Sequence, residues 1–305
     1  MNAEQLWREV AGENLLAGPA CAPPAAAKSP LDLAIVAVRG ADAQAFLHAQ
    51  FAADLRTLGA DQAVLTAWCS PQGRVLFAPE VLASEDGFLL LVDRVQAADL
   101  VRRLRLYVLR AQVSVDALDE AWAGIRVSGP DPAVAATGLV SAADGEVRWY
   151  LGPQDLVATA WAGLAAPAVS PATARLDDIR RGRPRLGAAT ADRFLPQELD
   201  LDQGRGVSFD KGCYPGQEIV ARVRYRGNVK RRLAHLACAA ALATGDRLVE
   251  PAGDTPRGTV IDAVSLADGW ECLAVLDAEA GEIAAAAHPA TPCRRLAPAS
   301  TALAD

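Results

Sequence analysis

Glycine and proline limit how long any one element of this chain can be. The 305 residues include 24 glycines and 19 prolines, and proline removes a backbone donor and fixes φ. The apolar runs between them are short, and none approaches the roughly 20 residues that a membrane-spanning helix needs. The chain is 51% hydrophobic and 22% charged, which is typical of a globular protein. We therefore expect short strands mixed with helices, an α+β fold without a membrane segment.

The first part of the chain alternates between the two kinds of element. An amphipathic helix is expected over 1–17, followed by an irregular connector over 18–30. Asp42 is expected to cap a helix whose apolar face carries Phe46, Leu47, Phe51 and Leu55. A helix is also expected from Asp93. Further strands are predicted at 33–38, 63–69, 88–92 and 107–115, with a hairpin turn at 70–73 after which 74–78 continues the chain.

A second unit repeats this style. Strands are predicted at 122–127 and 147–151, followed by a helix at 154–164. Ser170 followed by proline is a strong helix start, and that helix should end near Gly182. Residues 183–210 have no clear periodicity. A long ordered loop of this kind in a compact protein is usually functional.

The pattern changes after Gly227. Short strands separated by glycine-rich turns predict a small β-barrel. The predicted organisation is an N-terminal α+β subdomain over 1–117, a central α+β subdomain over 118–228 and a C-terminal β-barrel over 229–305. The barrel strands are expected at 231–238, 247–250, 258–264 and 271–276.

Composition and spacing exclude several classes of function. The net charge of −7 argues against a general nucleic-acid-binding protein. Six cysteines are scattered singly and three histidines lie far apart, so neither a disulfide framework nor a metal site is expected. No apolar h-region follows the N-terminus, so we expect no secretory signal. A reducing cytoplasm fits these observations best.

Positive charge is concentrated in one segment. Residues 175–232 contain fourteen Lys and Arg against eight Asp and Glu, a net charge of +6, so the rest of the chain carries −13. Such a concentration favours a site for an anionic small molecule. The alternative is a solvated face with local ion pairs.

Within this segment the loop 211–218 combines residue types that suit a reactive site. Gly212 and Gly216 permit conformations and close approaches that a Cβ would block. A helix beginning after Gly216 would present free N–H groups to an anion. Cys213 lies beside Lys211 and several arginines, and both cations and a helix start lower a thiol pKa. Cys213 is therefore the candidate reactive thiol, with a small buried cysteine as the alternative.

Two features of this region stay open. Residues 219–226 could form a helix, with Arg222 and Arg226 one turn apart, or a strand, and the helix is favoured. Tyr214 could stack on a planar ligand or pack in the core.

The loop residues also carry a family resemblance. Lys211-Gly212-Cys213-Tyr214-Pro215-Gly216-Gln217-Glu218, with Arg222 and Arg226-Gly227 after it, closely resembles the K-G-C-Y-x-G-Q-E signature of the YgfZ family. These are folate-binding proteins related to the glycine-cleavage T-protein. Weaker matches are Phe46 to Gln50 with Asp54, Ser70 to Arg74, Ile179 to Pro184 and Pro196 to Leu199.

The resemblance implies a fold and a function. It implies a three-domain T-protein-like ring with two α/β subdomains, a C-terminal small β-barrel and tetrahydrofolate in a central channel. It implies an accessory role in assembling or repairing iron–sulfur clusters in client enzymes, including some that modify tRNA. The alternative is a folate-dependent aminomethyltransferase or other one-carbon transferase. Partners would be folate and client or assembly proteins, without direct nucleic-acid or membrane contact.

The signature also suggests roles for its residues. Cys213 would be the catalytic thiol, and the folate contacts would come from Lys211, Gly212, Tyr214, Gly216, Gln217, Glu218, Arg222 and Arg226, with no metal ligand. One position departs from the T-protein pattern, because Arg180 stands where those proteins carry a folate-binding glutamate. A guanidinium cannot accept the hydrogen bonds of a carboxylate, so folate is expected to bind differently or weakly.

Overall fold

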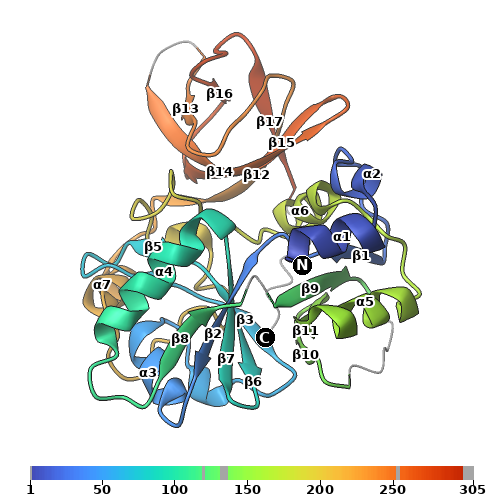
Figure 1. Cartoon of the computed structure of the whole chain (residues 1–305). Helices are drawn as coiled ribbons and strands as arrows, with labels where there is room; N and C mark the ends of the chain where they lie inside the picture. Colours follow the sequence, from blue (N-terminus) through green and yellow to red (C-terminus); the bar gives the residue numbers. More distant parts are fainter. Residues whose placement is uncertain (1, 119–120, 131–136, 252–254, 298–305) are drawn as a thin grey trace.

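The described residues form two larger β-sheets with their helices, a two-stranded hairpin and a β-barrel. A computed structural model describes residues 2–118, 121–130, 137–251 and 255–297. The barrel lies at one end, above the two sheets in Figure 1. The predicted α+β fold with a C-terminal barrel is confirmed. No helix in the described ranges is long and apolar enough to cross a membrane.

The first sheet is antiparallel, and two helices cover one face. Its strand order is β3-β6-β7-β2-β8. Leu47 of α3 and Leu100 and Leu104 of α4 are fully buried against Val36 and Leu90 of the sheet, so the apolar helix faces hold this layer. The elements are β2 (Ala34–Arg39), α3 (Ala43–Gln50), η1 (Leu55–Thr57), β3 (Ala63–Leu65), β6 (Glu80–Ser84), β7 (Gly87–Val92), α4 (Arg94–Tyr107) and β8 (Ser114–Ala117).

The second sheet includes the N-terminal segment. Its order is β1-β9-β11-β10, and the rings of Trp7 in α1 and Trp161 in α5 meet edge to face at 5.1 Å on its outer face. The start of the chain therefore packs with residues beyond 120. The elements are α1 (Ala3–Val10), α2 (Glu13–Leu16), β1 (Ala27–Pro30), β9 (Trp122–Ser128), β10 (Val140–Asp144), β11 (Val147–Pro153) and α5 (Gln154–Gly163).

The inner faces of the two sheets pack together. Ile35, Leu82 and Leu91 of the first sheet form one buried cluster with Trp149 and Leu151 of the second. The two sheets therefore face one another across this cluster. Helices α3 and α4 cover the outer face of the first sheet, and α1 and α5 cover the outer face of the second (Figure 1).

The barrel closes with the strand order β12-β15-β14-β13-β16-β17. Helix α6 (Pro171–Arg180) lies between the second sheet and the barrel, and the Ser170 side chain caps it by accepting from Thr173 N at 3.1 Å. Gly182 follows that helix at φ 69°, as predicted. The strands are β12 (Arg231–Cys238), β13 (Arg247–Val249), β14 (Pro256–Leu266), β15 (Gly269–Asp277), β16 (Ile283–Ala285) and β17 (Pro292–Leu296).

Several sequence predictions are wrong in detail. The helix expected over 1–17 is broken at Gly12, whose φ of 84° lies outside the helical region. The connector 18–30 ends in strand β1. The strand expected over 107–115 begins only at Ser114. Asp42 precedes α3 without capping it, because its carboxylate accepts from Gln112 N at 2.7 Å.

Candidate functional site

Lys211 anchors the cysteine loop to the first sheet unit. Its buried ammonium donates to the backbone carbonyl oxygens of His48, Phe51 (2.5 Å) and Ala53 (3.0 Å). His48 lies in the last turn of α3, where helix carbonyls lack helical partners. Burial lowers the pKa of Lys211 to about 8, so the ammonium is charged at neutral pH. Its three N–H groups bind backbone, which gives Lys211 a positioning role and corrects the expectation of a free cation beside the thiol.

Two tight turns meet at the base of the loop. The hairpin of β4 (Trp68–Cys69) and β5 (Val75–Phe77) turns at Gly73, and helix α7 (Gln217–Arg226) follows Gly216. Both glycines have positive φ, 75° and 79°. A Cβ on Gly216 would meet Ser70 O and would lie 2.7 Å from the Gly73 Cα. The Ser70 to Arg74 turn and the cysteine loop, far apart in sequence, therefore form one packed unit.

Gly216→Ala tests this close approach. The added Cβ meets backbone atoms and the residue keeps a positive φ, so we expect a loss of about 2–3 kcal/mol in the free energy of unfolding, measured with urea. Gly212→Ala is the matched control, because a Cβ there meets nothing within 4 Å. Its expected change is below about 0.5 kcal/mol. Equal stabilities of the two variants would contradict the packing of these turns.

The loop turns two side chains inward and leaves the cysteine outside. Tyr214 is buried beside Phe194 and Leu186, and the Lys211 ammonium lies 5.2 Å from its ring centroid. Of the two readings of Tyr214, packing is therefore the one observed. Cys213 and Gly212 are exposed. A rigidly anchored loop thus presents one thiol to the outside.

Helix α7 settles the choice left open for 219–226. The segment is helical, and the Gln217 side chain donates to Lys211 O at 3.4 Å, which closes the loop. The Gln217 N–H is already used by Tyr214 O at 3.2 Å. Glu218, Arg222 and Arg226 are exposed.

The long loop 183–210 holds this unit from the other side. Val75 N donates to Phe194 O at 2.8 Å, and the Gln197 side chain donates to Val220 O in α7 at 2.7 Å. The Thr66 hydroxyl donates to Gly206 O at 2.7 Å. Backbone pairing with the hairpin explains how a segment without periodicity is ordered.

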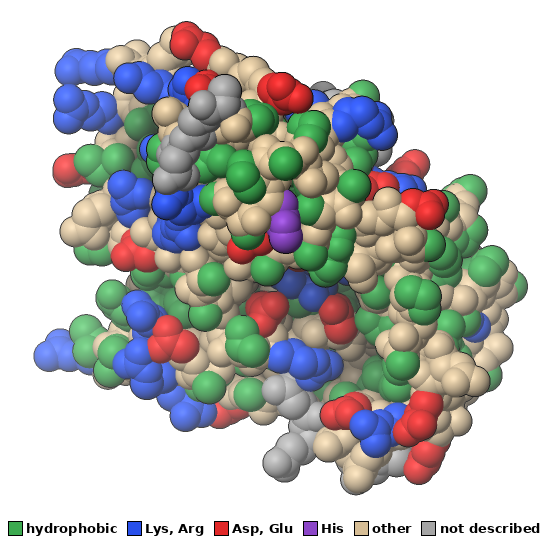
Figure 2. All heavy atoms as spheres, turned by 90° about the horizontal axis from the view of Figure 1, so that it is seen from above, with side chains coloured by type: hydrophobic (Ala, Val, Ile, Leu, Met, Phe, Trp, Pro, Cys, Tyr) green, Lys and Arg blue, Asp and Glu red, His purple; other side chains and the backbone are tan. Residues whose placement is uncertain are grey.

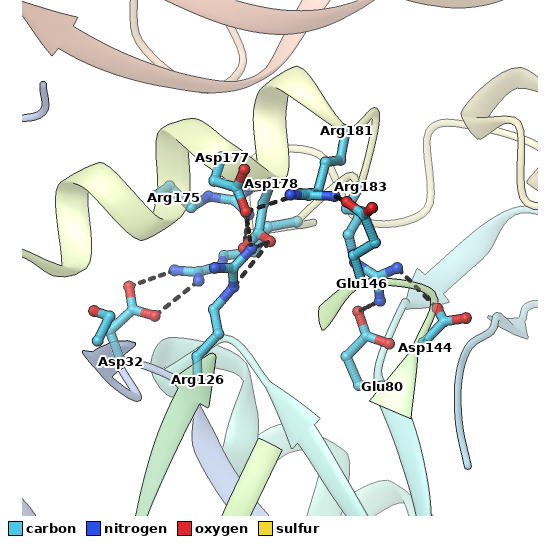
Figure 3. Close-up of polar contacts among 12 residues, drawn as sticks. Asp32, Glu80, Arg126, Asp144, Glu146, Arg175, Asp177, Asp178, Arg181 and Arg183 are labelled. Carbon is cyan, nitrogen blue, oxygen red and sulfur yellow. Dashed lines mark hydrogen bonds and ion pairs between the residues drawn. The ribbon is translucent and has the colours of Figure 1, made fainter. Parts of the chain in front are cut away.

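A buried ionic network fills the centre of the molecule, between the two sheets and α6 (Figure 3). Arg185 binds Asp32 through two hydrogen bonds of 2.7 and 2.8 Å, and Arg126 binds Asp177 at 2.7 Å. Arg183 binds Glu80 at 2.6 Å and Asp144 at 2.8 Å. Asp32, Glu80, Arg126, Trp149, Asp178, Arg183 and Arg185 are among the residues lining a cavity of about 40 Å³, here called the chamber.

Glu80 is the unusual carboxyl of the chamber. Burial, together with the nearby Asp144 carboxylate, raises its pKa to about 7, although the Arg183 guanidinium opposes this shift. Its Oε2 atom is buried and has no hydrogen-bond partner among the described residues. A buried acceptor without a donor is costly, so a ligand donor would be favourable there.

A larger cavity of about 540 Å³ adjoins the chamber. This vestibule shares Pro30, Leu31 and Asp32 with the chamber, so the two spaces are neighbours at one neck. Its volume lies in the range of roughly 300–1,000 Å³ that small-molecule sites occupy. The rest of its lining comes from α1, α2 and the starts of α4 and α6: Glu4, Trp7, Arg8, Glu13, Leu16, Ala17, Arg94 and Pro171.

The residues predicted to contact folate lie outside both of these cavities. None of the eight residues assigned to folate from the loop and α7 lines the chamber or the vestibule, and neither does Cys213. Sequence reasoning missed the chamber residues. The arginines from Arg175 to Arg185 could have indicated these residues. They were counted as part of a positively charged segment, although carboxylates from distant segments neutralise several of them.

Arg180, the departure from the T-protein pattern, binds the barrel. Its guanidinium makes two hydrogen bonds of 2.6 and 3.0 Å to Glu271 in β15, and His235 Nε2 lies 2.8 Å from the same carboxylate. Arg180 is outside the chamber lining. It therefore joins α6 to the barrel.

The other cysteines divide by exposure. Cys69, Cys238, Cys272 and Cys293 are buried and Cys21 is exposed. Burial raises the pKa of Cys69 to about 12, so it stays a neutral thiol. The described part of the chain contains no group of three or more His, Cys, Asp and Glu side chains placed to hold a metal ion.

Known proteins match this chain over most of its length. The family model of the GCVT N-terminal domain matches residues 32–152. The tRNA-modifying protein YgfZ of Edwardsiella ictaluri is 34% identical over 271 residues, which cover 79% of this chain and 81% of that protein. The protein of the same name from Escherichia coli (strain K12 / DH10B) is 30% identical over 287 residues, 83% of this chain and 87% of that protein.

A solved structure has the same fold. The glycine cleavage system aminomethyltransferase T from Bartonella henselae superimposes with a TM-score of 0.67 over 89% of this chain and 84% of that chain, at 14% identity. This similarity supports the T-protein-like architecture, and the extent of the sequence similarity decides the family. The chain belongs to the YgfZ family.

Proposed function

We propose that this protein is a tetrahydrofolate-binding accessory factor that supports iron–sulfur cluster assembly or repair in client enzymes, including enzymes that modify tRNA. The observation that carries the proposal is the exposed thiol of Cys213 on a loop anchored by buried Lys211. The relatives named tRNA-modifying proteins support the connection to tRNA. An exposed thiol can reach a partner protein, whereas a thiol inside a cavity serves only a small substrate.

Folate is assigned to the chamber and vestibule. The pterin ring of a folate carries amino and ring N–H donors, and Glu80 Oε2 is a buried acceptor without a partner among the described residues. The vestibule has the volume for the molecule, whereas the chamber has room only for the edge of a ring or a few waters. Asp32, at the neck between the two, would contact the polar edge that faces Glu80, and Trp7 and Leu16 would pack against the remainder. Bound tetrahydrofolate supplies a one-carbon carrier, and this chain's residues orient it and shield it from water.

Filling the vestibule tests this assignment. Ala17 is exposed and lines the vestibule, so Ala17→Trp should fill the space without disturbing the core. We expect the affinity for tetrahydrofolate, measured by calorimetry on the full chain, to fall about tenfold or more.

The matched control is Ala60→Trp. Ala60 is also exposed and lines a different cavity, beside Ser84 and Trp122. This variant should bind tetrahydrofolate like the wild type. If Ala17→Trp binds equally well, the vestibule does not hold folate.

A one-carbon transferase is the second candidate, and Glu80 is the observation that favours it. A carboxyl with a pKa of about 7 can exchange a proton near neutral pH. Incubation with tetrahydrofolate and a protein-bound aminomethyl donor separates the two candidates. The accessory role predicts no transfer, while transfer that is lost in Glu80→Gln would establish the enzyme.

The compartment is part of the proposal. Six free cysteines agree with a reducing environment, and we place the protein in the cytoplasm.

A further inference from the structure

Two groups of cations in the basic segment 175–232 differ physically. In the first group every arginine from Arg175 to Arg185 faces a carboxylate. The pairs are Arg175 with Asp178 and Asp262, Arg180 with Glu271, Arg181 with Asp177 and Glu146, Arg183 with Glu80 and Asp144, and Arg185 with Asp32. These charges are neutralised inside the protein and are not available to an external anion.

The second group, on α7 and just after it, is exposed. Arg222, Arg224, Arg226 and Lys230 face solvent, and no ion pair joins them to a carboxylate in the described ranges. Their neighbour Arg232 does pair, with Asp200 at 3.0 Å and Asp202 at 3.1 Å. Four exposed cations without a carboxylate partner in the described ranges are thus gathered on α7 and the turn after it. Figure 2 shows Lys and Arg side chains along the side of the molecule where α7 lies in Figure 1.

Nearby acidic groups do not compensate this charge. Between 216 and 230 the chain has one carboxylate, Glu218. It precedes Arg222 by four residues, a spacing that suits an ion pair, yet no such pair is found among the described residues. Arg222 and Arg226 are themselves four residues apart, and like charges at this spacing destabilise a helix. An anionic partner would relieve that repulsion.

Apolar groups lie among the cations. Tyr225 is 68% exposed and Ile219 is 36% exposed. Ile219, Arg222 and Arg226 follow the spacing of one helix face, and Tyr225, three residues after Arg222, lies at its edge. Arg224 lies apart from this face, with its guanidinium 5.2 Å from the ring centroid of Phe209.

This mixture favours a protein over a nucleic acid. Exposed Tyr and Arg with an aliphatic side chain are enriched in protein interfaces. A polynucleotide would also meet a chain whose net charge is −7, and −13 outside the basic segment. A small cationic area on an acidic protein suits a compact acidic surface of another protein.

We propose that the α7 face, defined as Ile219, Arg222, Tyr225, Arg226 and Lys230, docks an acidic protein surface. Arg222 and Arg226 are about 6 Å apart along the helix axis. The partner surface should therefore carry carboxylates at a similar spacing, as on a helix with acidic residues at i and i+4, beside an apolar side chain. The inference goes beyond the proposed function, because it holds whether or not folate occupies the chamber.

The test uses the full chain and a defined acidic probe. The probe is a fluorescein-labelled helical peptide of about 20 residues built from Glu-Leu-Ala-Ala-Glu repeats, and binding is followed by fluorescence anisotropy at low and high salt. The wild type should bind saturably, with weaker binding at high salt. Arg222→Glu combined with Arg226→Glu should weaken binding about tenfold or more.

The matched control reverses two other exposed arginines. Arg110 and Arg294 are exposed, and no ion pair involves them in the part of the chain that is described. Arg110→Glu with Arg294→Glu gives the same net charge as the α7 variant and should bind the probe within about twofold of the wild type. Both double variants should keep the wild-type affinity for tetrahydrofolate, which separates this test from that of the proposed function.

Three results would overturn the inference. The first is the absence of saturable binding to the wild type. The second is an equal loss in both double variants, since that would reflect net charge alone. The third is tighter binding of a single-stranded RNA of equal charge that the α7 variant abolishes, which would make the face a nucleic-acid surface.

Discussion

Cys213→Ala is expected to abolish the support of client iron–sulfur enzymes while the protein stays folded. The side chain is exposed and belongs to no buried cluster, so the free energy of unfolding should change by less than about 0.5 kcal/mol. Tetrahydrofolate affinity should also persist, because Cys213 lines neither the chamber nor the vestibule. The measurement is the activity of a tRNA-modifying iron–sulfur enzyme in cells that carry only the variant, compared with cells that lack the protein.

Cys21→Ala is the matched control for that experiment. Cys21 is the other exposed cysteine among the described residues, and its sulfur lies 3.5 Å from the Thr173 hydroxyl, far from the loop in sequence. Client activity should remain at the wild-type level in this variant. Wild-type activity in Cys213→Ala as well would mean that the thiol has no part in the function.

Reactivity gives an independent measure of the same thiol. Cys213 is exposed, whereas Cys69, Cys238, Cys272 and Cys293 are buried. Alkylation of the folded protein in a variant without Cys21 should therefore modify Cys213 well before the buried thiols. Equal rates at Cys213 and the buried cysteines would contradict the exposed position of this thiol.

The elements with strong local signals could be predicted from the sequence. Helix α6 begins at Pro171, after its cap Ser170, and ends at Arg180, just before Gly182, so cap, proline and glycine each lie within one turn of a helix end. Strands β12 to β15 of the barrel were predicted because glycine-rich turns separate them, whereas β16 and β17 were not predicted. In both cases the residues that decide the structure are neighbours in sequence.

Elements that depend on distant partners were missed. Strand β1 contains Lys28, a poor signal for a buried strand, and it is buried because its ammonium donates to the carbonyl oxygens of Trp161 and Leu164 at 2.7 and 2.8 Å. The short strands β6 and β10 were also missed, although each pairs with the next strand across a two-residue turn, β6 with β7 and β10 with β11. Such hairpins do carry a local signal.

The candidate site also has a part that was predicted and a part that was missed. The loop, its glycines and the exposed thiol follow from residues 211–218 alone. The chamber does not, because Arg183 binds Glu80 and Arg185 binds Asp32, partners 103 and 153 residues away. A charge count detects the arginines, but only the tertiary structure shows that the first half is paired inside and that α7 remains exposed.

Lys211 belongs to both parts. The sequence predicts it as a site residue, and in the fold its ammonium binds buried backbone carbonyls. Lys28 offers a comparison of similar chemistry. Both ammonium groups donate to backbone carbonyls in a buried setting, and both lie near an aromatic ring, Tyr214 at 5.2 Å and Trp161 at 4.7 Å. Only Lys211 belongs to the loop that carries the thiol.

Lys211→Met should therefore lose both stability and function. Methionine fills much of the space but leaves the carbonyls of His48, Phe51 and Ala53 without their charged donor. Hydrogen bonds to charged groups and the cost of unsatisfied acceptors give an expected loss of about 3–5 kcal/mol in the free energy of unfolding, measured with urea. Lys28→Met should lose a comparable amount and still support client enzymes when folded. If Lys211→Met keeps client activity at a temperature where both variants are folded, the anchor does not position Cys213.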